Sequence, residues 1–337
     1  MNKITIVGRS GSGKTCYFYA MMNALTRGRH GFALCLKNRN DFLMINQGMK
    51  RLKNSRLPLK ERWPKATNTV ETFDMELTYC TRPIAQFQWT DYPGELLSVS
   101  SAKFIEILKD TSCLLVCVDG GLMQGGEEDI GDIIGDIKID CGLELNNALL
   151  QAAKSNGGLP PVCVVITKYD LVSPALSTAK CQERIVKGVF GSLFRAGLKA
   201  DIECTVCPVS LGREIALGGK LEPKNIEMPM FYANYILLMQ ELRDVVASAK
   251  ADADLRDKAV AAWNNSGVIG RLLTPRPRPV TEEEKKAISE MLDKKKGVLD
   301  GVIKEFNGMH RFVNGKETPW PQPQPSTPRP DGFTDGR

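Results

Sequence analysis

Along roughly its first 250 residues, the chain alternates short continuous apolar runs with longer stretches where apolar residues recur every three or four positions. Short runs rich in β-branched and aromatic residues are typical of strands, whereas the longer spacing is typical of amphipathic helices. The pattern predicts strands at residues 3–7, 70–79, 84–90, 113–118, 162–167 and 202–209. It predicts helices between and after them at residues 14–26, 98–109, 127–154, 182–198 and 230–247.

This order of elements predicts a three-layer α/β fold in which helices cover a largely parallel sheet. The second and third strands are joined by only a few residues around Arg82 and Pro83. A parallel crossover needs a dozen or more residues, so these two strands are expected to form an antiparallel hairpin. The predicted sheet therefore has six strands, which are mostly parallel with one antiparallel strand.

Other segments lie outside this alternation. Residues 28–66 form an insertion after the first helix, with a helix of its own expected near residues 41–53. A short helix is expected at residues 251–263, before a proline-rich break. Thr281 and Glu284 then have the spacing of a capping box, so a further helix is expected to begin there.

That last helix carries an apolar stripe interrupted by Lys295. The stripe consists of Ile288, Met291, Leu292, Leu299, Val302, Ile303 and Phe306. It is expected either to pack on the core or to bind a partner protein. We therefore expect a main α/β domain at residues 1–248, a helical extension at 249–317 and a mobile, polyproline-type tail at 318–337.

Charge is concentrated in the insertion. Between Arg27 and Ala66 there are eleven Lys or Arg residues and two acids, which gives +9. The whole chain carries +6, so the remainder carries −3. The basic segment is either a solvated surface or a surface for an anionic partner such as lipid, nucleic acid or an acidic protein.

The remaining composition is that of an ordinary globular protein, with 42% hydrophobic and 25% charged residues. No apolar run approaches the ~20 residues of a membrane span, and the N-terminus reads as a strand rather than a signal peptide. We expect a cytoplasmic protein whose ten cysteines are mostly reduced and buried. Cys204 and Cys207 have CxxC spacing without a second pair nearby. With only two histidines, the composition argues against histidine-based catalysis.

Residues 8–15 read Gly-Arg-Ser-Gly-Ser-Gly-Lys-Thr, which matches GxxxxGK[ST] between a predicted strand and a predicted helix. Such a loop turns backbone N–H groups toward phosphate oxygens, and the helix N-terminus adds partial positive charge. Lys14 is expected to reach the β- and γ-phosphates of a nucleoside triphosphate, and the Thr15 hydroxyl to coordinate Mg²⁺. The nucleotide-binding residues expected here are Gly8, Gly11, Ser12, Gly13, Lys14, Thr15 and Cys16.

A second motif follows the third predicted strand, where Asp91 begins the sequence Asp-Tyr-Pro-Gly-Glu. A carboxylate at this place in a P-loop protein holds Mg²⁺. The backbone N–H of Gly94, three residues later, is expected to contact the γ-phosphate. The segment is thus predicted to sense whether that phosphate is present.

A third motif, Thr167-Lys168-Tyr169-Asp170, closes the fifth predicted strand. The Asp170 carboxylate is expected to accept from the N1–H and amino group of guanine, a donor pair that adenine lacks. The stem of Lys168 is expected to lie over the ring. Ser210, after the sixth strand, marks a loop whose backbone is expected to contact the guanine O6. Thr167 completes the motif, and the predicted ligands are GTP and GDP.

In this order the motifs resemble those of Ras-like P-loop GTPases of the translation-factor-related (TRAFAC) class, over about residues 1–248. The pentapeptide that begins at Asp91 looks like that of bacterial proteins from conflict systems and multi-protein operons, sometimes called double-GTPase types. The resemblance implies a GTP/GDP switch with slow, Mg²⁺-dependent hydrolysis. Lys14, Gly94 and the residue after Gly94 would serve catalysis.

Two departures from that pattern stand out. Thr167 occupies a position where Asn is usual. Glu95 occupies the place of the Gln that orients the attacking water in Ras-like proteins. A carboxylate cannot donate to the transition state as an amide does, so slow turnover is expected. The switch threonine that would close over Mg²⁺ is expected at Thr69, 22 residues before Asp91, with Thr67 as the alternative. The alternative interpretation is that neither threonine has a switch role and that both are ordinary hydroxyl residues of a loop.

The basic insertion lies just before these threonines, which suggests an internal arginine finger. Such a residue neutralises charge in the transition state. Arg62 and Arg56 are the positions to test first.

Three functions fit these motifs. The leading one is a GTP-binding switch with slow hydrolysis, read by protein partners through its switch loops, C-terminal helix or proline-rich tail. A second is a nucleotide-bound scaffold that does not hydrolyse. A third, a P-loop ATPase or kinase, does not account for Thr167 to Asp170.

Overall fold

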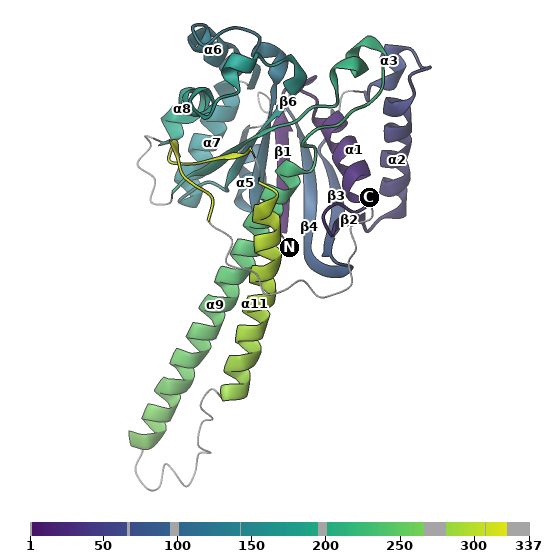
Figure 1. Ribbon diagram of the computed structural model, residues 1–337. Coiled ribbons are helices and arrows are strands. Elements are labelled where there is room, and N and C mark those ends of the chain that lie inside the picture. Colours follow the sequence, from purple (N-terminus) through teal and green to yellow (C-terminus); the bar gives the residue numbers. More distant parts are fainter. Residues whose placement is uncertain are drawn as a thin grey trace. The chain divides into compact units, whose positions relative to one another are not determined.

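The computed structural model describes residues 2–65, 68–94, 101–141, 143–194, 201–265, 281–306 and 308–321 (Figure 1). Contacts divide the chain into two compact units. The first unit comprises Met1–Ile236 together with Glu305–Pro321, and the second comprises Leu237–Lys304 among the described residues. The predicted proline-rich tail lies outside the described residues from position 322 onward.

The first unit is built on a nine-stranded sheet with the order β2-β3-β4-β1-β5-β6-β7-β8-β9. The strands are β1 (Asn2–Gly8), β2 (Phe32–Leu36), β3 (Glu71–Tyr79), β4 (Arg82–Pro93), β5 (Cys113–Asp119), β6 (Val162–Thr167), β7 (Glu203–Pro208), β8 (His310–Val313) and β9 (Lys316–Glu317). β1 pairs in parallel with β4 and β5, and the parallel pairing continues through β6 and β7. β3 and β8 are antiparallel to their neighbours.

The six predicted strands are all present, but the predicted total of six is wrong. β2 lies within the basic insertion, and β8 and β9 extend the opposite edge of the sheet. The last two are joined by Asn314 and Gly315, whose φ angles are 50° and 73°. An Asn-Gly pair with both φ angles positive is the preferred two-residue hairpin turn, so the sequence did contain a signal for this hairpin.

The helices of the first unit agree broadly with the predicted ones. They are α1 (Lys14–Leu25), α2 (Arg39–Lys53), α3 (Leu59–Arg62), α5 (Ser101–Lys109), α6 (Ile130–Cys141), α7 (Leu143–Asn156) and α8 (Ala179–Phe194). Short 3₁₀ turns lie at Gly120–Leu122, Tyr169–Leu171, Pro174–Leu176 and Arg213–Leu217. The helix predicted at residues 127–154 is two helices, α6 and α7, and the insertion contains the helix expected near residues 41–53.

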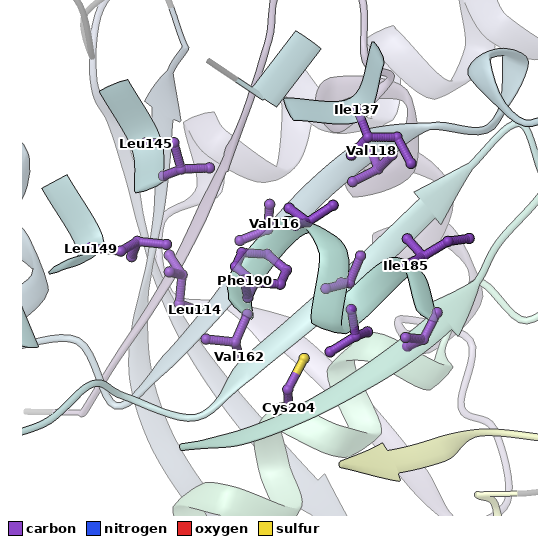
Figure 2. Close-up of a cluster of buried hydrophobic side chains, with 14 of the residues drawn as sticks. Leu114, Val116, Val118, Ile137, Leu145, Leu149, Val162, Ile185, Phe190 and Cys204 are labelled. Carbon is purple, nitrogen blue, oxygen red and sulfur yellow. The ribbon is translucent and has the colours of Figure 1, made fainter. Parts of the chain in front are cut away.

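Helices α5 to α8 cover one face of the sheet. Alternate residues of β5, namely Leu114, Val116 and Val118, point into this layer. They meet Leu149 from α7 and Phe190 from α8 in one buried cluster (Figure 2). Fully burying such a side chain contributes about 1.5–3 kcal/mol. Both faces of the central strands are covered, so every residue of β6 and all but the last of β5 are buried.

The other face is covered by α1 and the first turns of α9 (Met228–Asn265). Phe18 of α1 stacks on Trp89 of β4, with ring centroids 5.1 Å apart. Phe231 of α9 meets Phe32 of β2 at 5.3 Å. This packing sets α1 firmly on the sheet, which in turn fixes the loop that precedes it.

The second unit consists of the rest of α9 and α11 (Glu282–Lys304). The two helices predicted at 230–247 and 251–263 are one continuous helix of 38 residues, since no Gly or Pro interrupts its Ala-rich middle. The predicted capping box is confirmed: the Thr281 N–H donates to Glu284, and the Glu284 N–H donates to the Thr281 hydroxyl. Lys295, which interrupts the apolar stripe, pairs with Glu241.

After α11 the chain returns to the first unit. The indole N–H of Trp320 donates to the carbonyl of Met309 at 2.9 Å, and its ring lies 4.3 Å from that of Phe306 and 5.7 Å from that of Tyr235. Trp320 thus fixes the end of the described chain to the sheet. In the described part of the protein, every helix is too short or too polar to cross a bilayer.

Candidate nucleotide-binding site

The phosphate loop joins the carboxyl end of β1, a central parallel strand, to the N-terminus of α1. Gly13 caps this helix with a φ of 87°, a left-handed conformation that side chains disfavour. A Cβ at this position would also contact the Thr167 side chain at 3.4 Å. The loop therefore has the backbone shape that an anion-binding helix N-terminus requires.

Lys14 lies across this loop. Its ammonium donates to the carbonyl oxygens of Gly8 at 2.6 Å and Arg9 at 3.0 Å, and the side chain is buried. A buried cation beside a helix N-terminus makes the loop strongly attractive to an anion. The neighbouring Arg9 points elsewhere, to an ion pair with Asp140 of α6 at 3.2 Å.

Asp91 lies near the end of β4, opposite Ile6 of β1 and Glu71 of β3. The carboxylate is 4% exposed, and its Oδ1 atom has no hydrogen-bond partner among the described residues. Burial raises the pKa of Asp91 to about 6, while the charge of Lys14 lowers it and that of Glu71 raises it. A buried carboxylate oxygen that has no hydrogen-bond partner is well suited to bind a cation.

A magnesium ion would fit this set of donors. No group of three or more His, Cys, Asp or Glu side chains converges in the described chain. Mg²⁺ needs no such cage, because it is commonly held by one or two carboxylates, substrate phosphates and water. Asp91 would supply the carboxylate, and Thr15 in the first turn of α1 would supply a hydroxyl.

Gly94 closes tightly on the phosphate loop. A Cβ added to it would lie 2.4 Å from the Gly8 carbonyl oxygen and 2.9 Å from the Arg9 Cα. Only glycine allows this approach, so the end of the β4 segment rests on the loop as the predicted sensor would. Glu95 and Thr67 lie outside the described residues. Thr69 is exposed, and its hydroxyl makes no hydrogen bond to the described residues, so its switch role stays a prediction.

Thr167 connects three segments. Its hydroxyl lies 2.7 Å from the Ser12 carbonyl oxygen and 3.1 Å from that of Val118. The side chain is buried at the end of β6 and contacts Gly13. A hydroxyl thus links the phosphate loop, β5 and the guanine motif, which gives the Thr that replaces the usual Asn a defined role.

Lys168 is held by an acid that the sequence analysis missed. Its ammonium pairs with the carboxylate of Asp119 at the end of β5, and Asp119 also accepts from the Gly121 N–H at 2.9 Å. Lys168 has a φ of 49° and a partly exposed side chain. The available signal was an acid ending an apolar strand at the same sheet edge as Asp91.

Asp170 and Ser210, which were predicted to contact different edges of guanine, are hydrogen-bonded to each other. The Ser210 hydroxyl donates to the Asp170 carboxylate and accepts from the Gly212 N–H at 2.9 Å. The Tyr169 N–H donates to the Val209 carbonyl at 3.1 Å. The carboxylate is therefore held in one orientation and remains only half-buried.

Cys16 lies between the two halves of the site. Burial raises the pKa of its thiol to about 12, and the charge of Lys168 opposes that rise. It packs at the edge of a small apolar cluster formed by Met49, Leu52 and Ile215 with Trp63, Leu211 and Leu221. The cluster brings the insertion and the segment after β7 beside the start of α1.

Arg62 and the CxxC pair are placed differently from what their sequence positions suggest, whereas Arg56 is exposed and its role as an arginine finger stays a prediction. The guanidinium of Arg62 is buried and donates to the carbonyls of Leu52 and Gly219, so it is not free to act as an arginine finger. Cys204 and Cys207 are three residues apart on a strand and therefore point to opposite faces. Cys204 lies in the cluster of Figure 2, whereas the Cys207 thiol contacts that of Cys163 at 3.2 Å.

Comparison with known proteins agrees with this geometry. A family model described as Double-GTPase 2 matches residues 2–210, well over half of the chain. The matched region begins with β1 and ends at Ser210, so it contains every motif of the site. No curated protein matches the chain.

Proposed function

The chain belongs to the Double-GTPase 2 family, and we propose that it is a guanine-nucleotide switch that binds Mg·GTP and GDP and hydrolyses GTP slowly. The observation that carries the guanine assignment is the hydrogen bond between Ser210 and Asp170. It orients a half-buried carboxylate at the same sheet edge as the phosphate loop.

The phosphate end of the ligand would be held by the loop at residues 8–15. Its backbone N–H groups, the α1 N-terminus and Lys14 supply positive charge at one place. The tie from Thr167 to Ser12 fixes the distance between this loop and the guanine motif. A nucleoside triphosphate would therefore meet both parts at once.

Thr15 and Asp91 are the residues that would hold Mg²⁺. Held by these residues, the ion would supply positive charge that stabilises the negative charge of the phosphates. Asp91 is ready for this role because its Oδ1 has no partner in the described chain. Thr69 would join the set if the segment before β3 closes over the ion.

At the base end, Asp170 would accept from the guanine N1–H and amino group. Ser210 keeps this carboxylate from rotating, and the pairing of Lys168 with Asp119 holds the lysine stem beside it. A preorganised acceptor discriminates against adenine because adenine offers the half-buried carboxylate no matching pair of donors.

Hydrolysis is proposed to be slow because Glu95 follows Gly94 where an amide side chain would help most. We propose that protein partners from the same bacterial conflict or multi-protein system recognise which nucleotide is bound. The buried free thiols of the protein, such as those of Cys113 and Cys163, suit a reducing cytoplasm. The basic face of α2 remains a surface suited to an anionic partner.

A non-hydrolysing scaffold is the second candidate. It is favoured by the second unit, whose helices expose the large apolar side chains of Val246, Leu255 and Met291. Such residues are available for a partner. On this reading the nucleotide is a structural ligand, and the helices of the second unit carry the function.

Two measurements test these readings. Competition of GTP, GDP and ATP for the protein tests the guanine assignment, which fails if ATP displaces bound GTP at equal concentration. Release of phosphate from a single bound GTP, with and without Mg²⁺, separates the switch from the scaffold. A protein that retains intact GTP over many hours would favour the scaffold.

A further inference from the structure

Arg62 is among the largest fully buried side chains of the protein, at 1% exposure. Its Nε and Nη2 atoms donate to the Leu52 carbonyl oxygen at 3.3 Å and 2.9 Å, and Nη2 also donates to the Gly219 carbonyl oxygen at 3.0 Å. Its Nη1 atom makes no hydrogen bond to the described residues. No carboxylate of the described chain forms an ion pair with it.

The negative end of a helix offsets this buried charge. Leu52 belongs to the last turn of α2, where carbonyl groups lack partners within the helix and carry partial negative charge. Arg62 thus caps the C-terminus of α2 from within the insertion. Its second contact, to Gly219, reaches 157 positions along the chain to the segment after β7.

That segment begins at Ser210, the residue that orients Asp170. Its backbone is internally paired: the Ser210 and Lys224 N–H groups donate to each other's carbonyls, and the Glu222 N–H donates to Leu211 at 2.9 Å. The Gly219 N–H donates to Glu214 at 2.7 Å. The segment therefore moves as one piece, and a contact at Gly219 constrains Ser210.

Apolar packing supports the same connection. Met49 and Leu52 of α2 pack with Ile215 of this segment, and Trp63 and Leu211 pack against them. Polar and apolar contacts together attach the basic insertion to the segment that carries the guanine-recognising serine.

We propose that Arg62 is a positioning residue for guanine recognition, which holds residues 210–221 against the insertion so that Ser210 keeps Asp170 oriented. The inference rests on the proposed guanine binding. Within the described chain, the hydrogen bonds of Arg62 go to Leu52 and Gly219 and none goes to the phosphate loop. The base-dependent part of the affinity is therefore expected to depend on this residue more than the phosphate-dependent part does.

The test compares Arg62→Met with Arg39→Met in the full-length protein. Arg39 lies in the same insertion with an exposed side chain and is the matched control. Dissociation constants for GDP, ADP and inorganic tripolyphosphate are measured by competition against a fluorescent GDP analogue. Arg62→Met is expected to weaken GDP binding about tenfold while tripolyphosphate binding stays within about twofold of the parent. Arg39→Met is expected to change neither.

Arg62→Lys keeps the charge but has one nitrogen to serve both carbonyls. It is expected to lose about threefold in GDP affinity, and it replaces Arg62→Met if that variant does not fold. The proposal is overturned if GDP affinity is unchanged in both folded variants, or if GDP and tripolyphosphate weaken equally, as a general loss of structure would cause. A parent protein that does not prefer GDP to ADP would instead overturn the proposed function, and this inference with it.

Discussion

The Thr167 hydroxyl lies 2.7 Å from the carbonyl oxygen of Ser12, so the guanine motif is hydrogen-bonded directly to the phosphate loop. The same hydroxyl lies 3.1 Å from the carbonyl of Val118. A single side chain therefore joins the segment proposed to bind the base to the segment proposed to bind the phosphates.

Thr167→Val tests this connection. Val has nearly the same shape but lacks the hydroxyl that lies within hydrogen-bonding distance of the Ser12 and Val118 carbonyls, and losing that hydrogen bond costs about 1 kcal/mol or more. We expect a lower melting temperature and severalfold weaker binding of both GTP and GDP. Thr167→Ser, which keeps the hydroxyl, is the control. Equal nucleotide affinity in the Val and Ser variants would contradict the role given to this hydrogen bond.

Gly94→Ala tests the predicted sensor of the γ-phosphate. The new methyl group would lie 2.4 Å from the Gly8 carbonyl oxygen, so the end of β4 must move away from the loop. We expect GTP affinity to fall about tenfold and GDP affinity to change little, because only GTP carries the γ-phosphate. Gly135→Ala, on α6 with open space around it, should leave both affinities unchanged. An equal loss for the two nucleotides would argue against a sensor.

Asp91→Asn is expected to stabilise the nucleotide-free protein at pH 8 and to remove the effect of Mg²⁺ on GTP binding. Burial raises the pKa of Asp91 from 3.8 to about 6, so its protonated form is favoured in the folded state. The stability that it contributes is therefore present below the unfolded pKa and is lost as pH rises through about 6. The shift corresponds to a cost on the order of 3 kcal/mol at pH 8.

Chemical unfolding of the nucleotide-free parent and variant at pH 8 and pH 5 measures that cost. The stability difference should be larger at pH 8 than at pH 5, where the parent carboxyl is mostly protonated. A difference that is the same at both values would show that ionisation of Asp91 is not its source.

Asp170→Asn is expected to change which base is bound. The amide still offers an acceptor but now also donates, which suits a base with a carbonyl in place of the guanine amino group. Affinity for GDP should fall and affinity for xanthosine diphosphate should rise, which competition against a fluorescent nucleotide would show. If ADP gains as much as the xanthine nucleotide, Asp170 does not read this edge of the base.

Glu95→Gln is expected to raise the rate of a single GTP turnover severalfold. In the proposed mechanism the amide would donate to the transition state as a carboxylate cannot, and the substitution removes the negative charge of the residue that follows Gly94. Rapid mixing with limiting GTP and measurement of phosphate release gives the rate directly. An unchanged rate would remove Glu95 from the mechanism.

The local motifs of the site were predictable from the sequence, and the contacts between them were not. The phosphate loop and Asp170 follow from short motifs beside apolar strands. The tie from Thr167 to Ser12 joins residues 155 positions apart, and that from Arg62 to Gly219 joins residues 157 apart. Such pairs leave no periodic signal. Arg62 therefore looked like one more basic residue of the insertion, although its charge is buried.

The extra strands escaped prediction for a related reason. β2, β8 and β9 have five, four and two residues, too few to show a clear alternation of apolar and polar positions. Their place at the edges of the sheet is decided by pairing with β3 and β7. The Asn314–Gly315 turn was the one local signal in the sequence, and it pointed to the hairpin of β8 and β9.

The return of the chain to β8 after α11 has a mechanical consequence. The chain passes between the two units twice, at Ile236 and at Glu305. After the second passage, the chain is held in the first unit by the pairing of β8 with β7 and by the contacts of Trp320. A single cut between α9 and α11 would leave both pieces attached to the sheet. A force applied to these helices would therefore act on the sheet at two points. One is the part of α9 that packs on β2, and the other is β8, which pairs with β7.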